Sequence, residues 1–227
     1  MNQLHEAIRR LPAGVEFLVV VTWAFGLPIF SSILWLGTPE GEALPAFTNA
    51  TLVGALTFEV VQLIFLSWFL RIRGWTLEKF GLAFSWRATV VGVALLAFTY
   101  AVLVGAQYAA QLIFDFDLAA AAARIAKTGP ELNMQLMFLA SVVDGIFEEL
   151  FVAGYIITAL AERRGMWAAI NVSVVVRLLA HLYAGPIGVM TAVPMGLIYG
   201  YVYARTRQLW PLVVAHVLLD LIAMSVG

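Results

Sequence analysis

Seven apolar stretches constrain the fold of this chain more than any other feature of its sequence. A helix needs about 20 consecutive apolar residues to cross the hydrocarbon core of a bilayer. Of the 227 residues, 63% are hydrophobic and 12% are charged, whereas soluble domains carry about 25% charged residues. We therefore predict an all-α, polytopic transmembrane bundle of about seven spans. The spans are expected at Val15–Leu36, Phe47–Leu70, Ala88–Phe114, Leu132–Leu160, Trp167–Tyr183, Ile187–Tyr203 and Leu209–Val226.

Composition also excludes several classes of protein. The net charge is −1, so the chain has no basic field for binding nucleic acid. It has no cysteine, which rules out disulfides, thiolate metal ligands and a cysteine nucleophile. The polar, basic N-terminus precedes an apolar run that is too long for a cleavable signal peptide, so we expect a signal-anchor helix. We expect one membrane-embedded domain over residues 1–227, with a core region at about 132–227.

The distribution of basic residues predicts the orientation in the membrane. Ten of the 13 Lys and Arg residues fall on one side of the predicted spans, and two fall on the other. Cytoplasmic loops carry the excess of Lys and Arg, so we predict a cytoplasmic N-terminus and an external C-terminus, in a plasma or inner membrane. The ten are Arg9, Arg10, Arg71, Arg73, Lys79, Arg87, Arg163, Arg164, Arg205 and Arg207, and the two are Arg124 and Lys127. Acidic residues mark the external segments: Glu40, Glu42, Asp115, Asp117 and Glu131.

Two segments outside the spans are also expected to be helical. Residues 71–86 alternate basic and apolar positions, which is typical of an interfacial helix with Trp75 and Trp86 at headgroup level; an ordinary basic loop is the alternative. An alanine-rich run within residues 115–127 predicts a short external helix. Glu16, near the end of the first span, is expected to reach the interface.

Two adjacent glutamates, Glu148 and Glu149, lie in the middle of the fourth apolar stretch. A carboxylate in hydrocarbon costs roughly 2.5–3.5 kcal/mol on insertion scales, so an ionisable residue within a span indicates a functional site. Residues four apart share one helix face, and three spans carry such a polar pair. The pairs are Asp144 with Glu148, Arg177 with His181, and His216 with Asp220. We expect these faces to enclose a polar intramembrane cavity with the groups for general acid–base chemistry.

Motifs in this region resemble those of the CPBP family. The family contains membrane-embedded CAAX prenyl endopeptidases and bacteriocin-processing or immunity proteins, also called Abi-like. Its pattern is EExxxR, then FxxxH, then HxxxN or HxxxD, on successive core helices. The matching parts here are EELFVAGY, His181 within a helix, and LWPLVVAHVLLD. The resemblance covers about residues 71–220, and it implies an intramembrane protease that activates water with a glutamate.

The resemblance assigns roles by position in the motifs. It implies that Glu148, assisted by His181, deprotonates the attacking water. It implies that His216 and Asp220 stabilise the oxyanion, and that Glu149 is a supporting residue. The substrate would be a peptide or protein segment presented at the membrane among the lipids. A prenyl group on that substrate is implied only by the family's name.

Two positions depart from the family pattern, and we interpret them as linked. Ala153 stands where the motif arginine is expected, and Arg177 stands where the second motif begins with an aromatic residue. Glu149 would then be a buried carboxylate without its partner, and an unpaired buried charge costs several kcal/mol. We predict that Arg177 reaches Glu149 from the neighbouring helix.

Other functions stay open at this point. Ala153 favours a degenerate member of the family that binds peptides as an immunity or scaffold protein and does not cut. A transporter or proton relay would use Glu59, Asp144 and the two glutamates as its pathway. Inverted repeats would favour transport, and the sequence shows none. Asp144 lies outside the family pattern and is expected either to hydrogen-bond a neighbour or to line the cavity.

The expected mechanism needs no cofactor, but the same residues are compatible with a metal ion. Glu148, His181, His216 and Asp220 are nitrogen and oxygen donors of the kind that zinc accepts. Zinc at these four residues is therefore the alternative to a metal-free, glutamate-activated water.

Overall fold

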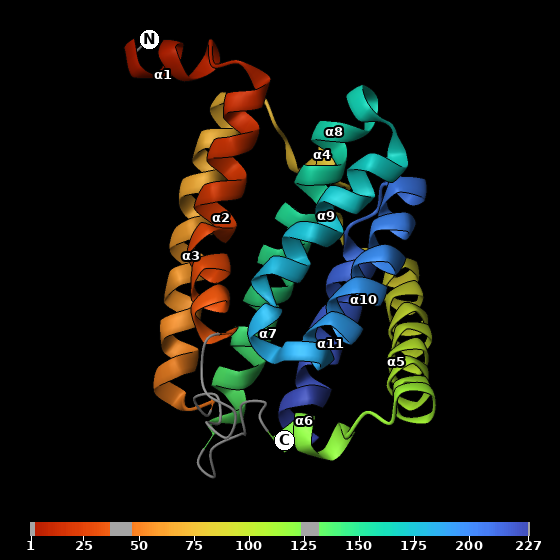
Figure 1. Ribbon diagram of the computed structural model, residues 1–227. Helices are drawn as coiled ribbons and strands as arrows, with labels where there is room; N and C mark the ends of the chain where they lie inside the picture. The colour runs from red at the N-terminus through yellow and green to blue at the C-terminus, as the bar shows by residue number, and fades with distance from the viewer. Residues whose placement is uncertain (1–2, 37–46, 124–131, 227) are drawn as a thin grey trace.

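The computed structural model describes residues 3–36, 47–123 and 132–226, and every regular element in these ranges is helical (Figure 1). The helices are α1 (Gln3–Arg9), α2 (Ala13–Leu36), α3 (Asn49–Ile72), α4 (Leu77–Phe80), α5 (Trp86–Phe114), α6 (Leu118–Ala123), α7 (Met134–Glu148), η1 (Glu149–Tyr155), α8 (Ile156–Arg164), α9 (Met166–Ala180), η2 (Leu182–Ala184), α10 (Gly185–Thr206) and α11 (Trp210–Val226). The prediction of an all-α bundle is confirmed.

Four of these helices are long and apolar enough to cross a membrane. Three of them are α2, α3 and α5. The fourth is α10 together with the turn η2 before it, over Leu182–Thr206. Helices α9 and α11 are apolar but shorter, with 15 and 17 residues. Each of the seven predicted spans is helical, with ends that shift by a few residues. The structure therefore supports a helical membrane protein, and the number of complete crossings stays a prediction.

The fourth predicted span is not one continuous α-helix. It begins as α7, changes to the π-helical segment η1 at Glu149, and continues as α8. All seven residues of η1 are buried. A π-helical turn leaves the regular hydrogen-bond ladder of the α-helix. Here Ser173 of α9 donates its hydroxyl to the carbonyl oxygen of Val152 within η1, at 2.7 Å, and so links the two segments.

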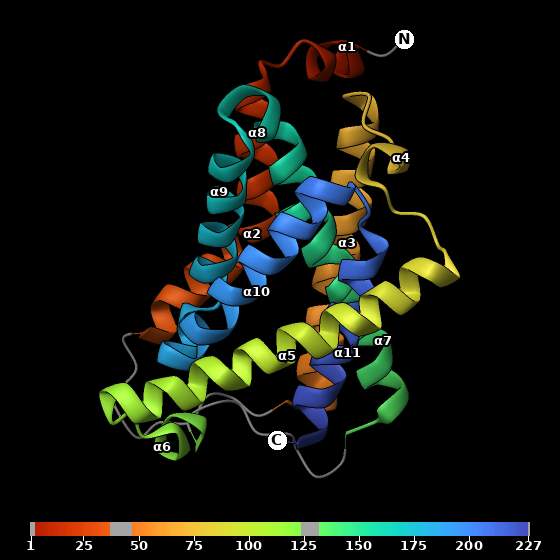
Figure 2. The same ribbon diagram turned by 90° about the vertical axis from the view of Figure 1, so that its right-hand side faces the viewer.

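The helices form two groups with α7 and α9 between them (Figures 1 and 2). Helices α2 and α3 lie side by side, and α5, α10 and α11 form the opposite group. Helix α7 packs against α3 and α11, and α9 packs against α2 and α10. The largest cluster of buried apolar side chains joins these helices to η1. Since η1 begins at Glu149, both glutamates lie next to the core of the bundle.

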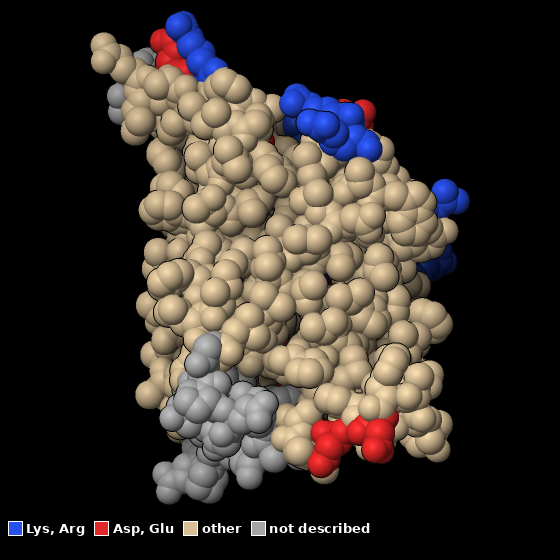
Figure 3. Space-filling view, in the orientation of Figure 1, with Lys and Arg blue, Asp and Glu red and all other residues tan. Residues whose placement is uncertain are grey.

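Charged side chains lie at the two ends of the molecule (Figure 3). In this view the Lys and Arg side chains lie in the half that carries α1, α4 and α8, with a few acidic side chains beside them, and a group of acidic side chains lies near α6 at the other end. Asp115 and Asp117, which directly precede α6, are exposed. The orientation in the membrane stays a prediction. The predicted external charges Glu40, Glu42, Arg124, Lys127 and Glu131 lie outside the described residues.

The predicted interfacial helix over residues 71–86 is wrong. Only the four residues of α4 are helical between the end of α3 and the start of α5. Gly74 and Gly81 have φ angles of +82° and +64° and interrupt the helix on either side of α4. Trp86 is exposed, but Trp75 packs inward with its ring 4.9 Å from that of Tyr155. The short helix predicted within residues 115–127 is present as α6 in the described part of this segment, and its external position stays a prediction.

Glu16 is buried and does not reach the interface as expected. Its Oε2 accepts a hydrogen bond from Arg73 Nε at 2.5 Å, and its Oε1 accepts from Trp75 Nε1 at 2.9 Å and from Tyr155 Oη at 3.1 Å. The buried charge is therefore paired and hydrogen-bonded through both oxygens. These three donors come from the α3–α4 connection and from η1. The sequence pattern did not predict that these two segments meet at Glu16.

Helices α5 and α11 approach closely because α5 has a glycine at their contact. A Cβ atom added at Gly92 would lie 2.7 Å from Val214 Cβ and 2.8 Å from the carbonyl oxygen of Pro211. A Cβ atom added at Gly105 of the same helix would meet nothing within 4 Å. Gly92 is therefore packed tightly against α11, whereas Gly105 of the same helix has open space beside it.

We predict that Gly92→Ala destabilises the protein by about 1–3 kcal/mol, because a methyl group there overpacks the contact. Gly105→Ala is the control, and it should leave stability unchanged or slightly higher because alanine favours the helix. Thermal unfolding of both variants in detergent measures the difference. Equal unfolding temperatures for the two variants would contradict the close packing of α5 on α11.

Candidate active site

The two glutamates lie at the junction between α7 and η1, and they differ in exposure. The side chain of Glu148 is 13% exposed, whereas that of Glu149 is 0% exposed. Adjacent residues on an α-helix point about 100° apart, so the pair faces two directions from one point of the backbone. Glu149 is enclosed by protein, and Glu148 is the carboxylate that a molecule from outside can reach.

Arg177 of α9 binds both glutamates. Its Nη2 lies 2.5 Å from Glu149 Oε1, and its Nη1 lies 3.1 Å from Glu148 Oε2. The predicted pairing of Arg177 with Glu149 is therefore confirmed, and the contact with Glu148 adds to it. The position of the motif arginine is filled by Ala153, which is buried in η1. The guanidinium thus comes from a neighbouring helix and holds α7, η1 and α9 together.

His181 follows the last residue of α9 and faces Glu148. Its Nδ1 lies 2.8 Å from the carbonyl oxygen of Arg177, and its Nε2 lies 3.7 Å from Glu148 Oε1. A carbonyl oxygen only accepts, so Nδ1 carries the proton and Nε2 of the neutral ring is an acceptor. Two acceptors therefore face each other at 3.7 Å. The helix face predicted to carry both Arg177 and His181 ends before His181, because α9 stops at Ala180 and His181 lies in the turn that follows. Both side chains nevertheless contact Glu148.

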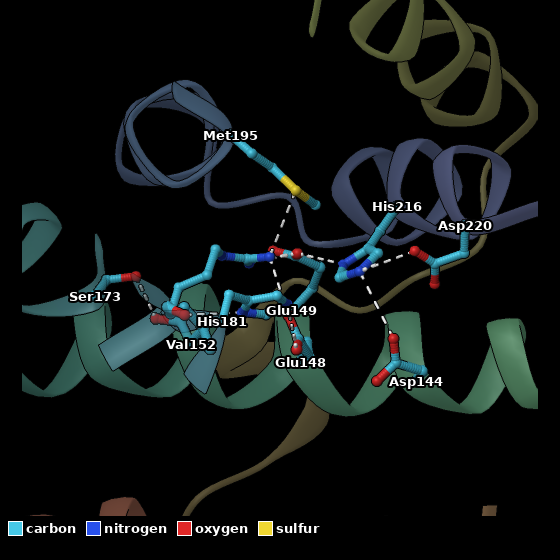
Figure 4. Close-up of polar contacts among 10 residues, drawn as sticks. Asp144, Glu148, Glu149, Val152, Ser173, His181, Met195, His216 and Asp220 are labelled. Carbon is cyan, nitrogen blue, oxygen red and sulfur yellow. Dashed lines mark hydrogen bonds and ion pairs between the residues drawn. The ribbon is translucent and has the colours of Figure 1, made fainter. Parts of the chain in front are cut away.

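His216 of α11 lies among three carboxylates, as Figure 4 shows. Its Nδ1 lies 2.7 Å from Glu149 Oε1, and its Nε2 lies 3.6 Å from Asp220 Oδ1 and 3.8 Å from Asp144 Oδ2. Because Glu149 pairs with Arg177 as a carboxylate, Nδ1 of His216 is the donor in the first contact. The other ring nitrogen is turned toward the two aspartates and away from the buried pair.

The structure brings Asp144 closer to the site than the sequence indicated. Asp144 lies outside the family pattern, but its carboxylate contacts the second nitrogen of His216. Glu59 of α3 in turn lies close enough to Asp144 for the two carboxyl groups to interact. The spacing of four residues between Asp144 and Glu148 predicted that Asp144 faces the site, whereas no motif pointed to Glu59. The acidic group therefore extends from α7 to α3.

Two further residues, Tyr183 and Ser32, lie at the site and were not predicted from the sequence. The ring of Tyr183 is stacked near that of His181, with 6.0 Å between centroids and an interplanar angle of 29°. The backbone N–H of Tyr183 donates to Ser32 Oγ of α2 at 2.8 Å. Tyr183 stands two positions after His181, which is a weak signal. Ser32 is 151 residues away in sequence and gives no signal at all.

Among the described residues, two triads could hold a metal ion. They are Asp144, His216 and Asp220, and Glu148, Glu149 and His216; in each, one donor atom per residue lies within 4.8 Å of the others. The first triad offers nitrogen and oxygen donors that suit zinc. In the second, Glu149 and one nitrogen of His216 are already bound to each other. His181 belongs to neither triad, so the four ligands named from the sequence do not converge as one set.

Comparison with known protein families identifies the region that carries this site. Residues 130–222 match the family model described as type II CAAX prenyl endopeptidase Rce1-like. No curated protein and no solved structure matches the chain significantly. This match confirms the resemblance to the CPBP family over residues 130–222, and the matched family is a protease family. All four residues predicted to be catalytic fall within the matched segment.

We predict that Arg177→Phe destabilises the protein by about 3–5 kcal/mol, because it removes the guanidinium from the buried carboxylate of Glu149 and leaves His216 as its remaining partner. The double variant Arg177→Phe/Ala153→Arg puts both residues back in the family pattern and should regain part of this loss. Arg163→Phe is the control, since Arg163 is exposed at the end of α8. Unfolding temperatures in detergent provide the measurement, and a stable Arg177→Phe variant would show that the ion pair is dispensable.

Proposed function

We propose that this protein is an intramembrane endopeptidase that hydrolyses a peptide bond with a water activated by Glu148. The observation that carries the proposal is the environment of Glu148. Its carboxylate is partly exposed, contacts Arg177 through one oxygen, and faces the imidazole of His181 through the other at 3.7 Å. A reachable carboxylate beside an imidazole is the arrangement that a general base and its assistant require.

The attacking water would bind between Glu148 Oε1 and His181 Nε2. Both atoms are acceptors, and a water molecule has two hydrogens to donate to them. As the oxygen attacks the substrate carbonyl, one proton passes to Glu148, and His181 fixes the orientation of the water. The same proton can then reach the leaving amine. Arg177 keeps Glu148 in place through its contact with the other oxygen.

The oxyanion that forms on the substrate would be stabilised by His216. Nδ1 is bound to Glu149, so Nε2 is the nitrogen available to the substrate. In the imidazolium form both nitrogens donate, and hydrogen bonds directed at developing charge are worth several kcal/mol. Asp220 and Asp144 lie 3.6 Å and 3.8 Å from Nε2, so their negative charges would favour the imidazolium while its N–H stays available to the oxyanion.

A divalent metal ion is the alternative source of activation. Asp144, His216 Nε2 and Asp220 would hold it, and the ion would supply Lewis-acid polarisation of a carbonyl or of water. Glu148 and His181 would keep their roles in either case, since both lie outside this triad.

We also propose the setting in which the reaction takes place. The protein would be integral to a plasma or inner membrane, with the basic end that carries α1 and α8 in the cytoplasm. Its partners would be lipids and a peptide segment presented at the membrane. The name of the matched family supports a CAAX-type, prenylated C-terminal segment as the first substrate class to examine.

A degenerate binding protein is the second candidate, and Ala153 favours it. The loss of the motif arginine would leave an unpaired glutamate in a simple decay of the family pattern. Arg177 supplies that charge from α9, and this observation supports the enzyme over the scaffold. A scaffold would bind the same peptides without turnover.

We expect Glu148→Gln to lower cleavage by about 10²–10⁴-fold, which is the usual contribution of a general base. The probe is an internally quenched peptide with a prenylated C-terminal CAAX sequence, and its unprenylated twin tests the need for the lipid. Glu78→Gln, at an exposed position of α4, is the matched control. Retention of more than a tenth of the activity by Glu148→Gln would remove Glu148 as the base, and peptide binding without cleavage by the unaltered protein would favour the scaffold.

We further expect Asp220→Asn to keep activity within about tenfold of the unaltered protein. Asparagine is the other residue of the family pattern, and it can still accept from His216 or donate to the oxyanion. Asp220→Ala removes both options and should cost about 10²–10³-fold, because His216, the donor to the oxyanion, then loses the charge that supports it. Initial rates on the same peptide give the comparison. Equal losses in the two variants would show that the ionised carboxylate itself is needed.

A further inference from the structure

Helix α2 lies outside the Rce1-like segment, yet it makes polar contacts with both parts of the backbone that carry the site. The contacts come from two buried side chains, Ser32 and Glu16. They are 16 residues apart on one helix, or about 24 Å at 1.5 Å per residue. One rigid element therefore touches the site region at two distant points.

The contact at Ser32 holds the turn that follows His181. The side chain of Ser32 is buried, and its hydroxyl accepts the backbone N–H of Tyr183 at 2.8 Å. This N–H belongs to η2, the single 3₁₀ turn between His181 and α10. On the other side, α10 approaches so closely that a Cβ atom at Gly188 would lie 2.3 Å from the carbonyl oxygen of His181. The backbone of His181 is therefore held between α2 and α10.

The contact at Glu16 holds the end of the π-helical segment. Tyr155 is the last residue of η1, its side chain is fully buried, and its hydroxyl donates to Glu16 Oε1 at 3.1 Å. Its ring also stacks on that of Phe17, with 6.2 Å between centroids. Since η1 begins at Glu149, this contact fixes the far end of the segment whose near end carries the two glutamates.

The two contacts act on irregular backbone, where regular helical bonds do not determine the geometry. A 3₁₀ turn and a π-helical segment both depart from the i to i−4 ladder, so their position depends on partners outside the segment. In a continuous α-helix the same side-chain contacts would only add stability. Here they lie on the segments that adjoin His181 and Glu148, whose separation of 3.7 Å is the critical distance of the site.

We propose that α2 sets the distance between Glu148 and His181, and that Ser32 and Glu16 are positioning residues for the reaction. Neither would touch the substrate. The catalytic consequence rests on the proposed peptidase function, whereas the effect on the His181 ring does not. Small misplacements of a catalytic group cost far more in rate than in binding or stability, up to about 10²-fold for 1 Å.

The test compares two conservative variants with matched controls. Ser32→Ala removes the acceptor for the Tyr183 N–H, and Tyr155→Phe removes only the hydroxyl bound to Glu16. Ser31→Ala and Tyr108→Phe are the controls, because both positions are exposed. Kinetics on the prenylated CAAX peptide, unfolding temperatures in detergent and NMR spectra of histidine-labelled protein are recorded for all four. The chain has three histidines, and single His→Gln substitutions assign their signals.

We expect Ser32→Ala and Tyr155→Phe each to lower kcat by about tenfold with KM within about twofold, because the rate depends on catalytic geometry. Ser32→Ala should also shift the imidazole signals of His181, while those of His5 stay in place and the controls match the unaltered protein. The proposal is overturned if Ser32→Ala leaves the His181 signals unchanged, whatever happens to the unfolding temperature. If the unaltered protein cleaves nothing, the peptidase function fails, and the His181 signals still decide the role of α2.

Discussion

Arg177 forms ion pairs with both glutamates and holds together the helices that carry the site. Buried charges are tolerated only when they are paired and hydrogen-bonded, and Glu149 is completely enclosed. Its Oε1 accepts from both Arg177 and His216. One oxygen therefore links η1, α9 and α11, the three elements that carry the site. The bundle could not bury Glu149 in this place if either donor helix moved away.

This arrangement separates the roles of two chemically identical neighbours. The charge of Glu149 is balanced by Arg177 and His216 within the protein, so this residue has a structural role. Glu148 shares the guanidinium but keeps one oxygen toward His181 and an exposed edge. An arginine at position 153 would have belonged to the same helical segment as the glutamates. An arginine from α9 also ties two helices together, so the exchange of positions adds a tertiary contact to the ion pair.

Much of the fold and of the site could be predicted from short-range patterns. The apolar runs predicted every long helix. Polar residues spaced four apart predicted that Glu148, Arg177, His181 and His216 lie close together. The energetic cost of an unpaired Glu149 was enough to predict its partner across two helices. The patterns failed where irregular backbone or distant contacts decide the result. The π-helical segment at Glu149 has no periodic signal, because apolar residues surround it on every side.

The failures at Glu16 and in the predicted interfacial helix have a common cause. Composition described residues 71–86 as amphipathic, and helix ends described Glu16 as free to reach water. In the structure the polar groups of the two segments bind each other, because Arg73 and Trp75 donate hydrogen bonds to the carboxylate of Glu16. Such a pairing joins segments 57 and 59 residues apart, and neither segment predicts it alone.

The irregular backbone and the site coincide for a physical reason. In a bilayer every backbone polar group must be satisfied within the protein, so non-helical geometry is tolerated only where protein surrounds it. Ser173 satisfies the carbonyl of Val152 in η1, and Ser32 satisfies the N–H of Tyr183 in η2. The same enclosure lowers the local dielectric and strengthens the contacts among Arg177, Glu148 and Glu149. The place where the chain can leave the regular helix is therefore also the place where its charged groups interact most strongly.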